Sequence, residues 1–284
     1  MVGAKIPLLN NAHPDIAREL SFFAVENDQP RKFTRGQIGT FNEMGFIFPL
    51  DVFTPEEATA NRSYFDSLMA AAASSGHQAY SINGWHTCCQ GIYDLLIDNR
   101  ILDYVQDLLG EDLICWGTHY FNKLPGDKKQ VIWHQDASYW PLTPSKTVTV
   151  WLAIDDVDVE NGAMQVIPGS HRHGQIDYEA STDEDKNVLN QSVRNPLQYG
   201  EAPVSFEMQA GQISLHTDLL LHGSEPNCSQ RRRCGLTIRY CPPDVRALKG
   251  WNKNGVVCRG RDWTGHWANH PCPDGEQIPG PKPK

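Results

Sequence analysis

Hydrophobic positions in the first part of the chain recur at helical spacing. Thr54-Pro55-Glu56-Glu57 predicts a helix start, with Thr as N-cap, Pro at the first helical position and Glu three residues after the cap. This helix should end near Ala73. A second apolar stripe runs from Ile92 to Leu109, and Gly110 supplies its stop. A short helix is also expected between Asp15 and Ala24, within a loosely structured N-terminal arm.

After Gly110 the pattern changes to short runs rich in β-branched and aromatic residues, separated by Pro, Gly and Asn turns. Helices followed by many short strands, with no helix between the strands, predict an antiparallel barrel or sandwich backed by helices. The expected strands are Leu113–Tyr120, Val131–His134, Thr147–Ile154, Met164–Ile167, Gln212–His216 and Gly235–Tyr240.

The length of 284 residues fits one large domain spanning 1–284. Residues 1–110 would form a largely helical support and 111–245 a β-rich core. A polar stretch near 177–202 carries few strand signals, and we interpret it as an insertion that acts as a lid over an active site. Residues 246–284 would form a C-terminal extension.

The overall charge limits the classes of partner. A net charge of -9 argues against nucleic acid, which requires a basic face. No apolar run is long enough to span a bilayer, and the first residues lack the apolar core of a signal peptide. The 8 cysteines include no C-x-x-C pair, so we expect free thiols and a cytoplasmic location. Oligomeric state is left open.

The first candidate for metal binding is Trp133-His134-Gln135-Asp136. On a strand, positions i and i+2 share a face, so the imidazole of His134 and the carboxylate of Asp136 can reach one ion. Such a pair is weak by itself, because H-x-D occurs often at surfaces. His222 strengthens it: it ends an apolar run just before a turn, in Leu221-His222-Gly223-Ser224. Two histidines and one carboxylate form the facial triad of non-haem Fe(II) sites.

Arg233 follows His222 by eleven residues. If the two lie on neighbouring strands joined by a turn at 226–230, the guanidinium enters the same barrel mouth. An Arg fork can bind the distal carboxylate of 2-oxoglutarate in a bidentate way, which Lys cannot match. Ser224 would face the same side and support that carboxylate. His216, six residues before His222, is the main rival for the third metal position.

The chain resembles the phytanoyl-CoA dioxygenase-like family of Fe(II)/2-oxoglutarate oxygenases. Matching segments cover most of its length, and the combination of WHQD, the N-G block ending in IPGSH, and H-G-S-x-x-N followed by Arg is highly specific. The segments are FNEMGFIFPLDVFTPEEA, FNKLPG, WHQDASYW, VTVWLAIDDVDVENGAMQVIPGSH, LHGSEPN and RRRCGLTIRY. The resemblance implies a mainly β fold with flanking helices, namely a double-stranded β-helix (jelly roll, cupin-like) core.

The resemblance also assigns roles to single residues. It implies that His134, Asp136 and His222 bind iron and that Arg233 and Ser224 bind 2-oxoglutarate. Trp151 matches a family position that lines the cosubstrate, with a core aromatic as its other interpretation, and Asn122 matches a position that bonds the cosubstrate in some members. Near the substrate we expect, from proximity to the motifs alone, Tyr139, Trp140, Thr118, His119 and His86.

The function implied by the resemblance is oxidation of a C–H bond in a small organic metabolite, with Fe(II), 2-oxoglutarate and O2 as cofactors and cosubstrates and with succinate and CO2 released. Halogenating relatives replace the carboxylate ligand by a small residue, so Asp136 predicts a hydroxylase, or an enzyme whose desaturation or demethylation starts from the same hydrogen abstraction. The alternatives are a metal-dependent hydrolase or isomerase and a non-catalytic metal-binding barrel. The sequence does not identify the substrate, although the acidic balance favours a small polar metabolite.

Overall fold

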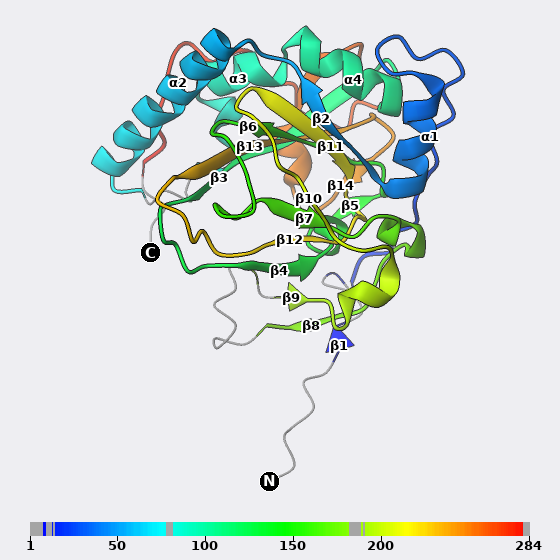
Figure 1. Ribbon diagram of the computed structural model, residues 1–284. Coiled ribbons are helices and arrows are strands. Elements are labelled where there is room, and N and C mark those ends of the chain that lie inside the picture. Colours follow the sequence, from blue (N-terminus) through cyan, green and yellow to red (C-terminus); the bar gives the residue numbers. More distant parts are fainter. Residues whose placement is uncertain are drawn as a thin grey trace.

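Two antiparallel sheets face each other and form the centre of the molecule (Figure 1). The structure is a computed structural model and describes residues 8–9, 13, 15–77, 82–181, 189 and 191–280. The larger sheet has the strand order β15 (Val256–Arg259), β3 (Leu113–Lys123), β13 (Arg233–Cys241), β6 (Val148–Ala153), β11 (Gln212–Thr217) and β2 (Phe46–Asp51). The smaller sheet has the order β10 (Val204–Ser205), β7 (Met164–Val166), β12 (His222–Ser224) and β4 (Val131–His134). This is a jelly roll with flanking helices, so the predicted fold class is confirmed.

Two small sheets complete the strand list. One has the order β1 (Leu8–Leu9), β8 (Tyr178–Ala180) and β9 (Gln191–Ser192), and the other pairs β14 (Arg246–Ala247) with β5 (Leu142–Thr143). The polar stretch near 177–202 thus contributes β8 and β9, whereas 182–188 and 190 lie outside the described residues. The predicted extension 246–284 contributes β14 and also β15, which forms an edge of the larger sheet.

Helices α1 (Arg35–Met44) and α2 (Pro55–Ser74) begin at threonine caps. In α2, the hydroxyl of Thr54 accepts from the backbone N–H of Glu57, and the Glu57 carboxylate accepts from the backbone N–H of Thr54. This capping box satisfies two donors that a helix start leaves free. The helix predicted from this signature is confirmed.

The apolar stripe from Ile92 to Leu109 forms two helices instead of the single helix predicted. These are α3 (Gln90–Leu96) and α4 (Asn99–Leu109). The break occurs because the Asp98 side chain caps a new helix, accepting from the backbone N–H of Arg100 at 2.9 Å. The stripe continues across the break because both helices pack on the same sheet.

The short helix predicted between Asp15 and Ala24 is absent. This segment uses its backbone for tertiary contacts: the carbonyl of Glu19 accepts from Ser145 N–H, and that of Leu20 accepts from Gln175 N–H. Arg18 donates to the carbonyls of Ala137 and Trp140, each at 2.7 Å. The arm therefore runs along the core as an extended segment, where local helix propensity is overridden by these bonds.

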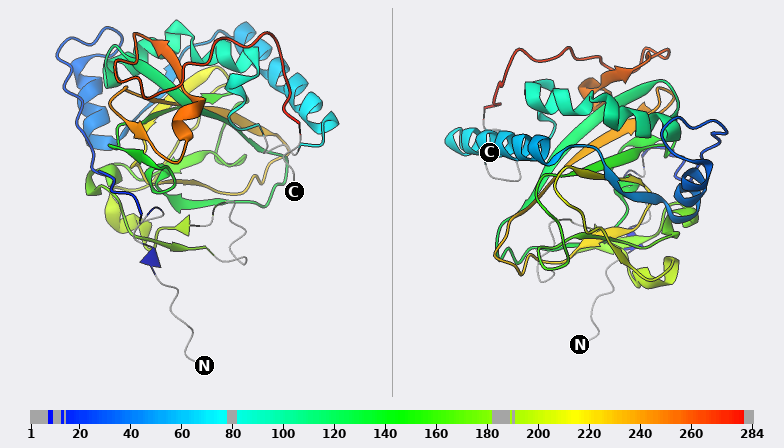
Figure 2. Two further views of the ribbon diagram at one scale, coloured as in Figure 1. Left: turned by 180° about the vertical axis from the view of Figure 1, so that it is seen from behind. Right: turned by 45° about the horizontal axis from the view of Figure 1, so that its top comes forward.

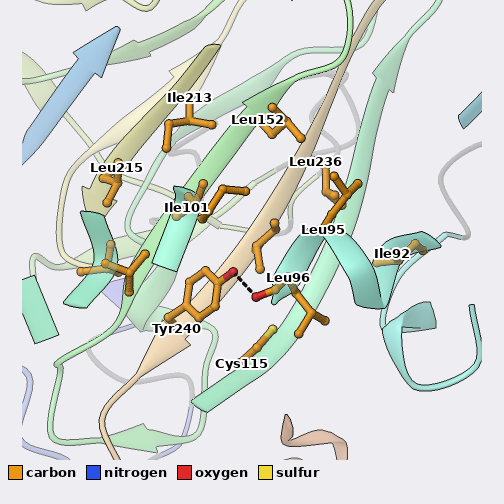
Figure 3. Packing of buried hydrophobic residues seen from close by; sticks show 14 of the residues in the cluster. Ile92, Leu95, Leu96, Ile101, Cys115, Leu152, Ile213, Leu215, Leu236 and Tyr240 are labelled. Carbon is orange, nitrogen blue, oxygen red and sulfur yellow. Dashed lines mark hydrogen bonds between the residues drawn. The ribbon is translucent and has the colours of Figure 1, made fainter. Parts of the chain in front are cut away.

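Helices α2, α3 and α4 cover the outer face of the larger sheet (Figure 2). Alternate residues of β13 point into this layer and are fully buried, and Figure 3 shows two of them, Leu236 and Tyr240, among the helix side chains. The Tyr240 hydroxyl donates to the carbonyl of Leu96 in α3 at 2.8 Å, which satisfies a polar group inside the core (Figure 3).

The other residues of β13 point to the inner face, toward the smaller sheet. Since side chains alternate along a strand, one strand supplies both the hydrophobic core and the wall of an internal cavity. Within the described part of the chain, no helix has the length and apolar character needed to cross a membrane.

Candidate metal centre and its cavity

His134, Asp136 and His222 come together where the smaller sheet meets the internal cavity. His134 ends β4 and His222 begins β12, and the two are directly paired in the antiparallel register. Asp136 starts the 3₁₀ turn Asp136–Ser138 that follows β4. Its Oδ1 lies 3.7 Å from His134 Nε2 and 4.0 Å from His222 Nε2. One potential ligand atom from each residue lies within 4.8 Å of the others, a spacing that one metal ion can bridge.

The hydrogen bonds of the two histidines point their Nε2 atoms at this centre. His134 Nδ1 lies 2.9 Å from the carbonyl of Ile132, and His222 Nδ1 lies 2.9 Å from the carbonyl of Leu220. A carbonyl can only accept, so each Nδ1 carries the proton and each Nε2 keeps a lone pair. Burial and the neighbouring His134 lower the pKa of His222 to about 3, which keeps its imidazole neutral.

Asp136 remains ionised in the same environment. Burial alone would raise its pKa, but the side chain of His134 and the charges of His222 and Arg239 together hold the pKa below its usual range. Two neutral imidazoles and one carboxylate are the donor set that suits Fe(II) in non-haem sites. These residues therefore fit an iron ion, and they leave coordination positions for other ligands.

Two neighbours of the ligands set their geometry. Gln135 is buried between the two ligands of the H-x-D pair, and its amide donates to the carbonyls of Gly174 and Leu219 while accepting from Ile176 N–H. These bonds anchor the segment that carries Asp136. Gly223 permits the close approach of β12 to β4, because a Cβ there would lie 2.7 Å from the carbonyl oxygen of Val131.

A second cluster, formed by Arg233, Ser224 and Lys123, lies next to the metal centre. Arg233 is 4 % exposed; its Nε donates to the carbonyl of Gly162 at 3.1 Å, and one terminal nitrogen lies 3.5 Å from the Ser224 hydroxyl. Lys123 Nζ donates to the same hydroxyl at 2.8 Å and to the carbonyls of Ser224 and Glu225. Two buried cations thus converge on one serine.

Lys123 was not among the residues predicted from the sequence. It is 1 % exposed, and burial together with the charge of Arg233 lowers its pKa to about 7. Among the described residues, no carboxylate forms a salt bridge with Lys123. A buried ammonium is costly without an anion, and the guanidinium of Arg233 approaches the same hydroxyl, so this cluster fits the distal carboxylate of a 2-oxo acid. Strand alternation could have identified Lys123 from the sequence, because it places Lys123 on the same face of β3 as Phe121, which lines the cavity.

Trp151 forms the floor beside this cluster. The guanidinium carbon of Arg233 lies 5.9 Å from the centre of its ring. Gly235 makes room for the indole, since a Cβ at that position would lie 1.9 Å from Trp151 Cζ2. Trp151 is 4 % exposed and lines the cavity, so it combines the two roles considered from the sequence, a packed aromatic and a wall of the site.

The cavity that joins the two clusters has a volume of about 420 Å³. Three residues expected near the substrate line it, namely Tyr139, Trp140 and His119. Its wall also includes residues from both sheets and from the segment between β8 and β9, among them Phe121, Val131, Met164, Leu189, His216, Thr237, Arg239 and Trp251. Leu189, within the segment interpreted as a lid, is thus a cavity residue.

Three predicted site residues lie elsewhere; strand alternation explains Thr118 and Asn122, whereas His86 lies in the 3₁₀ turn Trp85–Thr87 and contacts Thr118. Thr118 and Asn122 occupy the outer face of β3, because Lys123 and its alternate neighbours take the inner face. Asn122 donates to the sulfur of Met69 in α2 at 3.5 Å, and Thr118 bonds to His86 Nδ1 at 3.0 Å. Asn122 is therefore corrected from a cosubstrate contact to a residue of the helix–sheet interface, and His86 and Thr118 from substrate contacts to a buried structural pair.

The predicted strand geometry around Arg233 also needs correction. His222 and Arg233 do not lie on neighbouring strands of one sheet, since β12 pairs with β4 and β7 whereas β13 pairs with β3 and β6. The intervening loop carries the chain from the smaller sheet to the larger one. Arg233 consequently meets Ser224 across the cavity, because the two sheets face each other.

His216, the rival third ligand, lies on β11 in the larger sheet. Its ring centre is 5.3 Å from that of His222, and it is not a member of the cluster with ligand spacing. Burial lowers its pKa to about 4, so it is neutral at physiological pH. It lies beside the metal centre as a wall of the cavity.

A jelly roll with two imidazoles and one carboxylate at the junction of sheet and cavity defines a mononuclear non-haem metal site. The family model for phytanoyl-CoA dioxygenase (PhyH) matches residues 41–235. The chain belongs to the phytanoyl-CoA dioxygenase (PhyH) family, as its sequence motifs predicted.

Two curated proteins illustrate the relationship. A probable alpha-ketoglutarate-dependent hypophosphite dioxygenase from Stutzerimonas stutzeri is 31% identical over 176 residues, which cover 60% of this chain and 59% of that protein. The peroxisomal phytanoyl-CoA dioxygenase of Bos taurus is 28% identical over 150 residues, covering 50% and 43%. The chain spans about half the length of the curated relatives it matches.

Solved structures agree on the fold. The non-heme monooxygenase ThoJ in its apo form is 28% identical, with 84% of this chain and 88% of that chain covered and a TM-score of 0.73. CytC3 with Fe(II) and alpha-ketoglutarate is 22% identical, with 87% and 98% covered and a TM-score of 0.62, and it shares the fold.

Proposed function

We propose that this protein is an Fe(II)- and 2-oxoglutarate-dependent oxygenase that hydroxylates an unactivated C–H bond of a small organic metabolite. The carrying observation is the adjacency of two clusters: His134, Asp136 and His222 at ligand spacing, and the buried cations Arg233 and Lys123, which converge on the Ser224 hydroxyl. A metal site alone is generic. A metal site beside a buried site for a carboxylate fits a 2-oxo acid cosubstrate.

The iron and 2-oxoglutarate would supply the oxidising chemistry with O2, releasing succinate and CO2. His134, Asp136 and His222 would hold the metal. The guanidinium of Arg233, oriented by the carbonyl of Gly162, would bind the distal carboxylate together with Lys123. The hydroxyl of Ser224 lies between these two cations and can turn its proton toward an incoming carboxylate.

The walls of the cavity serve orientation and exclusion of water. Tyr139 and Trp140 lie on the segment that follows Asp136 and line the cavity, and the Tyr139 ring packs edge-on against that of His134. Trp251 approaches from the C-terminal extension and Leu189 from the segment between β8 and β9. Such walls would hold a C–H bond close to the metal, where geometry limits which bond is attacked.

Hydroxylation is favoured over halogenation because Asp136 places a carboxylate where a halide would otherwise bind. Hydrolysis or isomerisation with another metal is less well supported, because neither reaction uses the buried cations Arg233 and Lys123. A metal-binding barrel without activity would likewise give these two cations no role. The eight free thiols fit a reducing cytoplasm as the location of the enzyme.

The test is a screen of metabolite classes with purified protein, Fe(II), O2 and 2-oxoglutarate, following succinate and the mass of the organic product. The proposal predicts a metabolite that stimulates succinate formation and gains one oxygen atom, with no change when chloride is replaced by another anion. A halide-containing product from the unmutated protein, or a ring closure or epimerisation without oxygen gain, would overturn the hydroxylase assignment. Metal-dependent hydrolysis without succinate would overturn the oxygenase assignment itself.

A further inference from the structure

Arg239 is a second buried arginine in the cavity, and it belongs neither to the set of metal ligands nor to the cluster around Ser224. It lies on the inner face of β13, six residues after Arg233, which corresponds to about 20 Å along a strand. The whole residue is 9% exposed, and it lines the cavity. Among the described residues no carboxylate lies within ion-pair distance of it, and its Nε is buried without a hydrogen-bond partner.

Aromatic rings hold this guanidinium in place. Its carbon lies 5.6 Å from the ring centre of Trp116 and 5.2 Å from that of Trp140. Opposite it on β3 is Gly117, where an added Cβ would be 3.8 Å from an Arg239 terminal nitrogen. The two rings stabilise the cation by cation–π contact but offer no hydrogen-bond acceptor in return.

Two further unpartnered polar groups lie in the same cross-strand row. Thr149 is paired with Arg239 in the register of β6 and β13, and His216 is paired with Thr149 in that of β11 and β6. The Thr149 hydroxyl and His216 Nδ1 are both buried without a hydrogen-bond partner among the described residues. Buried polar groups are almost always satisfied, so three orphans in one row indicate a missing ligand. Each can donate, and an oxyanion would accept from all of them.

The charge balance of the cavity gives the same answer. A divalent metal, the Asp136 carboxylate, dianionic 2-oxoglutarate and the Arg233 guanidinium together carry no net charge. Protonated Lys123 would add positive charge. Asp136 acts on Arg239 through space, but as a metal ligand its charge would be committed to the ion. Arg239 is thus left as a buried cation that requires an anion.

We propose that Arg239, Thr149 and His216 form a binding site for a carboxylate, or a similar oxyanion, of the prime substrate. This inference rests on the proposed oxygenase function and adds the substrate class: an acid whose apolar or aromatic body packs against Tyr139 and Trp140. The metal ligand His222 lies between the two arginine sites, because it is in ring contact with His216 and two residues from Ser224. The acid group would therefore anchor the substrate on the side away from the cosubstrate.

The probes are aromatic acids paired with their amides: phenylacetate with phenylacetamide, and indole-3-acetate with its amide. Dissociation constants are measured by calorimetry on protein loaded with Ni(II) and 2-oxoglutarate, so that no turnover occurs. At least one acid should bind about tenfold or more tightly than its amide. Arg239→Gln should remove this preference by weakening the acid and leaving the amide unchanged. Arg246→Gln, which removes an exposed arginine outside the cavity, should keep it.

Equal binding of acid and amide by the unmutated protein, no binding of either acid, or an acid preference that survives Arg239→Gln would overturn the site. Thr149→Val keeps the shape of the side chain and removes only the hydroxyl, so this variant provides the test if Arg239→Gln does not fold. The preference of Thr149→Val for the acid over the amide should be smaller than that of the unmutated protein. An unchanged preference would count against the site. The affinity for 2-oxoglutarate distinguishes failure of the proposed function from failure of the substrate site alone. If the unmutated protein does not bind 2-oxoglutarate, the proposed function fails; if it does and only the acid preference is missing, the substrate site alone fails.

Discussion

Lys123 and Arg233 lie directly opposite each other in the antiparallel pairing of β3 with β13, and both side chains are buried. Like charges on facing positions of a sheet destabilise it. Here both cations turn to one hydroxyl, that of Ser224, which comes from the opposite sheet. The two cations repel each other in the free protein, and a carboxylate bound between them would remove that repulsion. Relief of the repulsion would therefore contribute to the free energy of 2-oxoglutarate binding.

Replacing Arg233 should weaken 2-oxoglutarate binding far more than metal binding. In Arg233→Gln, loss of one partner of a buried charge contact should raise the dissociation constant about 100-fold, equivalent to about 3 kcal/mol. Arg233→Lys should recover only part of this, since an ammonium cannot keep the Gly162 contact and also grip a carboxylate in a bidentate way. Calorimetry on Ni(II)-loaded protein measures the dissociation constant of 2-oxoglutarate for each variant.

The matched control is Arg231→Gln in the same run of three arginines. The side chain of Arg231 is 49% exposed and pairs with Asp158 outside the cavity. It should bind 2-oxoglutarate like the unmutated protein. Similar losses in the Arg231 and Arg233 variants would show that net charge, and not the site, explains the effect.

Lys123 should make 2-oxoglutarate binding depend on pH. Burial and the neighbouring Arg233 lower the pKa of Lys123 to about 7, so the free protein loses this charge as pH rises above 7. A bound carboxylate favours the charged form and raises the pKa again, so binding takes up a proton. Affinity should fall between pH 7 and pH 9, by up to about tenfold per unit.

Calorimetry in buffers of different ionisation enthalpy counts that proton. The unmutated protein should take up close to one proton per 2-oxoglutarate at pH 8 and far less at pH 6. Lys123→Met should bind more weakly at pH 6 and show a flat profile without uptake. Uptake that persists in Lys123→Met, or an affinity that increases with pH, would assign the proton to another group.

Gly235→Ala should damage the site through packing. The new methyl would overlap the indole of Trp151, with 1.9 Å between Cβ and Cζ2, so the ring or the strand must move. Overpacking of this kind costs about 1–3 kcal/mol of unfolding free energy, and it should also weaken 2-oxoglutarate binding because Arg233 lies over the ring. Thermal or urea unfolding and calorimetry give both quantities.

Gly39→Ala is the control for that glycine. Gly39 is exposed in α1 and has nothing within 4 Å of an added Cβ, so alanine should stabilise by about 0.5–1 kcal/mol. Cosubstrate affinity should not change. If Gly235→Ala were as stable as the Gly39 variant, the close fit of Trp151 against β13 would be wrong.

Sequence patterns predicted the structure correctly where a residue type at a given spacing has few alternative roles. The capping box at Thr54 located the start of α2, and the family motifs together with ligand spacing brought His134, Asp136 and His222 to one place. Arg233 also enters the cavity, although the route differs from the predicted one: its strand belongs to the opposite sheet. The motif therefore predicted correctly that Arg233 enters the cavity, although the predicted strand pairing was wrong.

The sequence did not identify which residue of β3 faces the cavity, because that depends on how side chains alternate along the strand. Asn122 and Lys123 are adjacent, and only one can face the cavity; a family position pointed to Asn122, whereas the pleat turned Lys123 inward. A one-residue difference in register exchanges the two faces of a strand, and sequence alone does not fix that register. Arg239 escaped notice for a related reason, since a lone arginine near the end of an apolar strand resembles a surface residue until the sheet buries it.

Consumption of 2-oxoglutarate by Fe(II)-loaded protein, when O2 is admitted to an anaerobic sample, tests the proposed oxygenase function most directly. We expect the unmutated protein to form one succinate per 2-oxoglutarate consumed, and we expect Asp136→Ala, which removes the only carboxylate of the metal cluster, to form none although it folds with the same secondary structure. No succinate from the unmutated protein in the presence of substrate, or equal succinate from Asp136→Ala, would contradict the account.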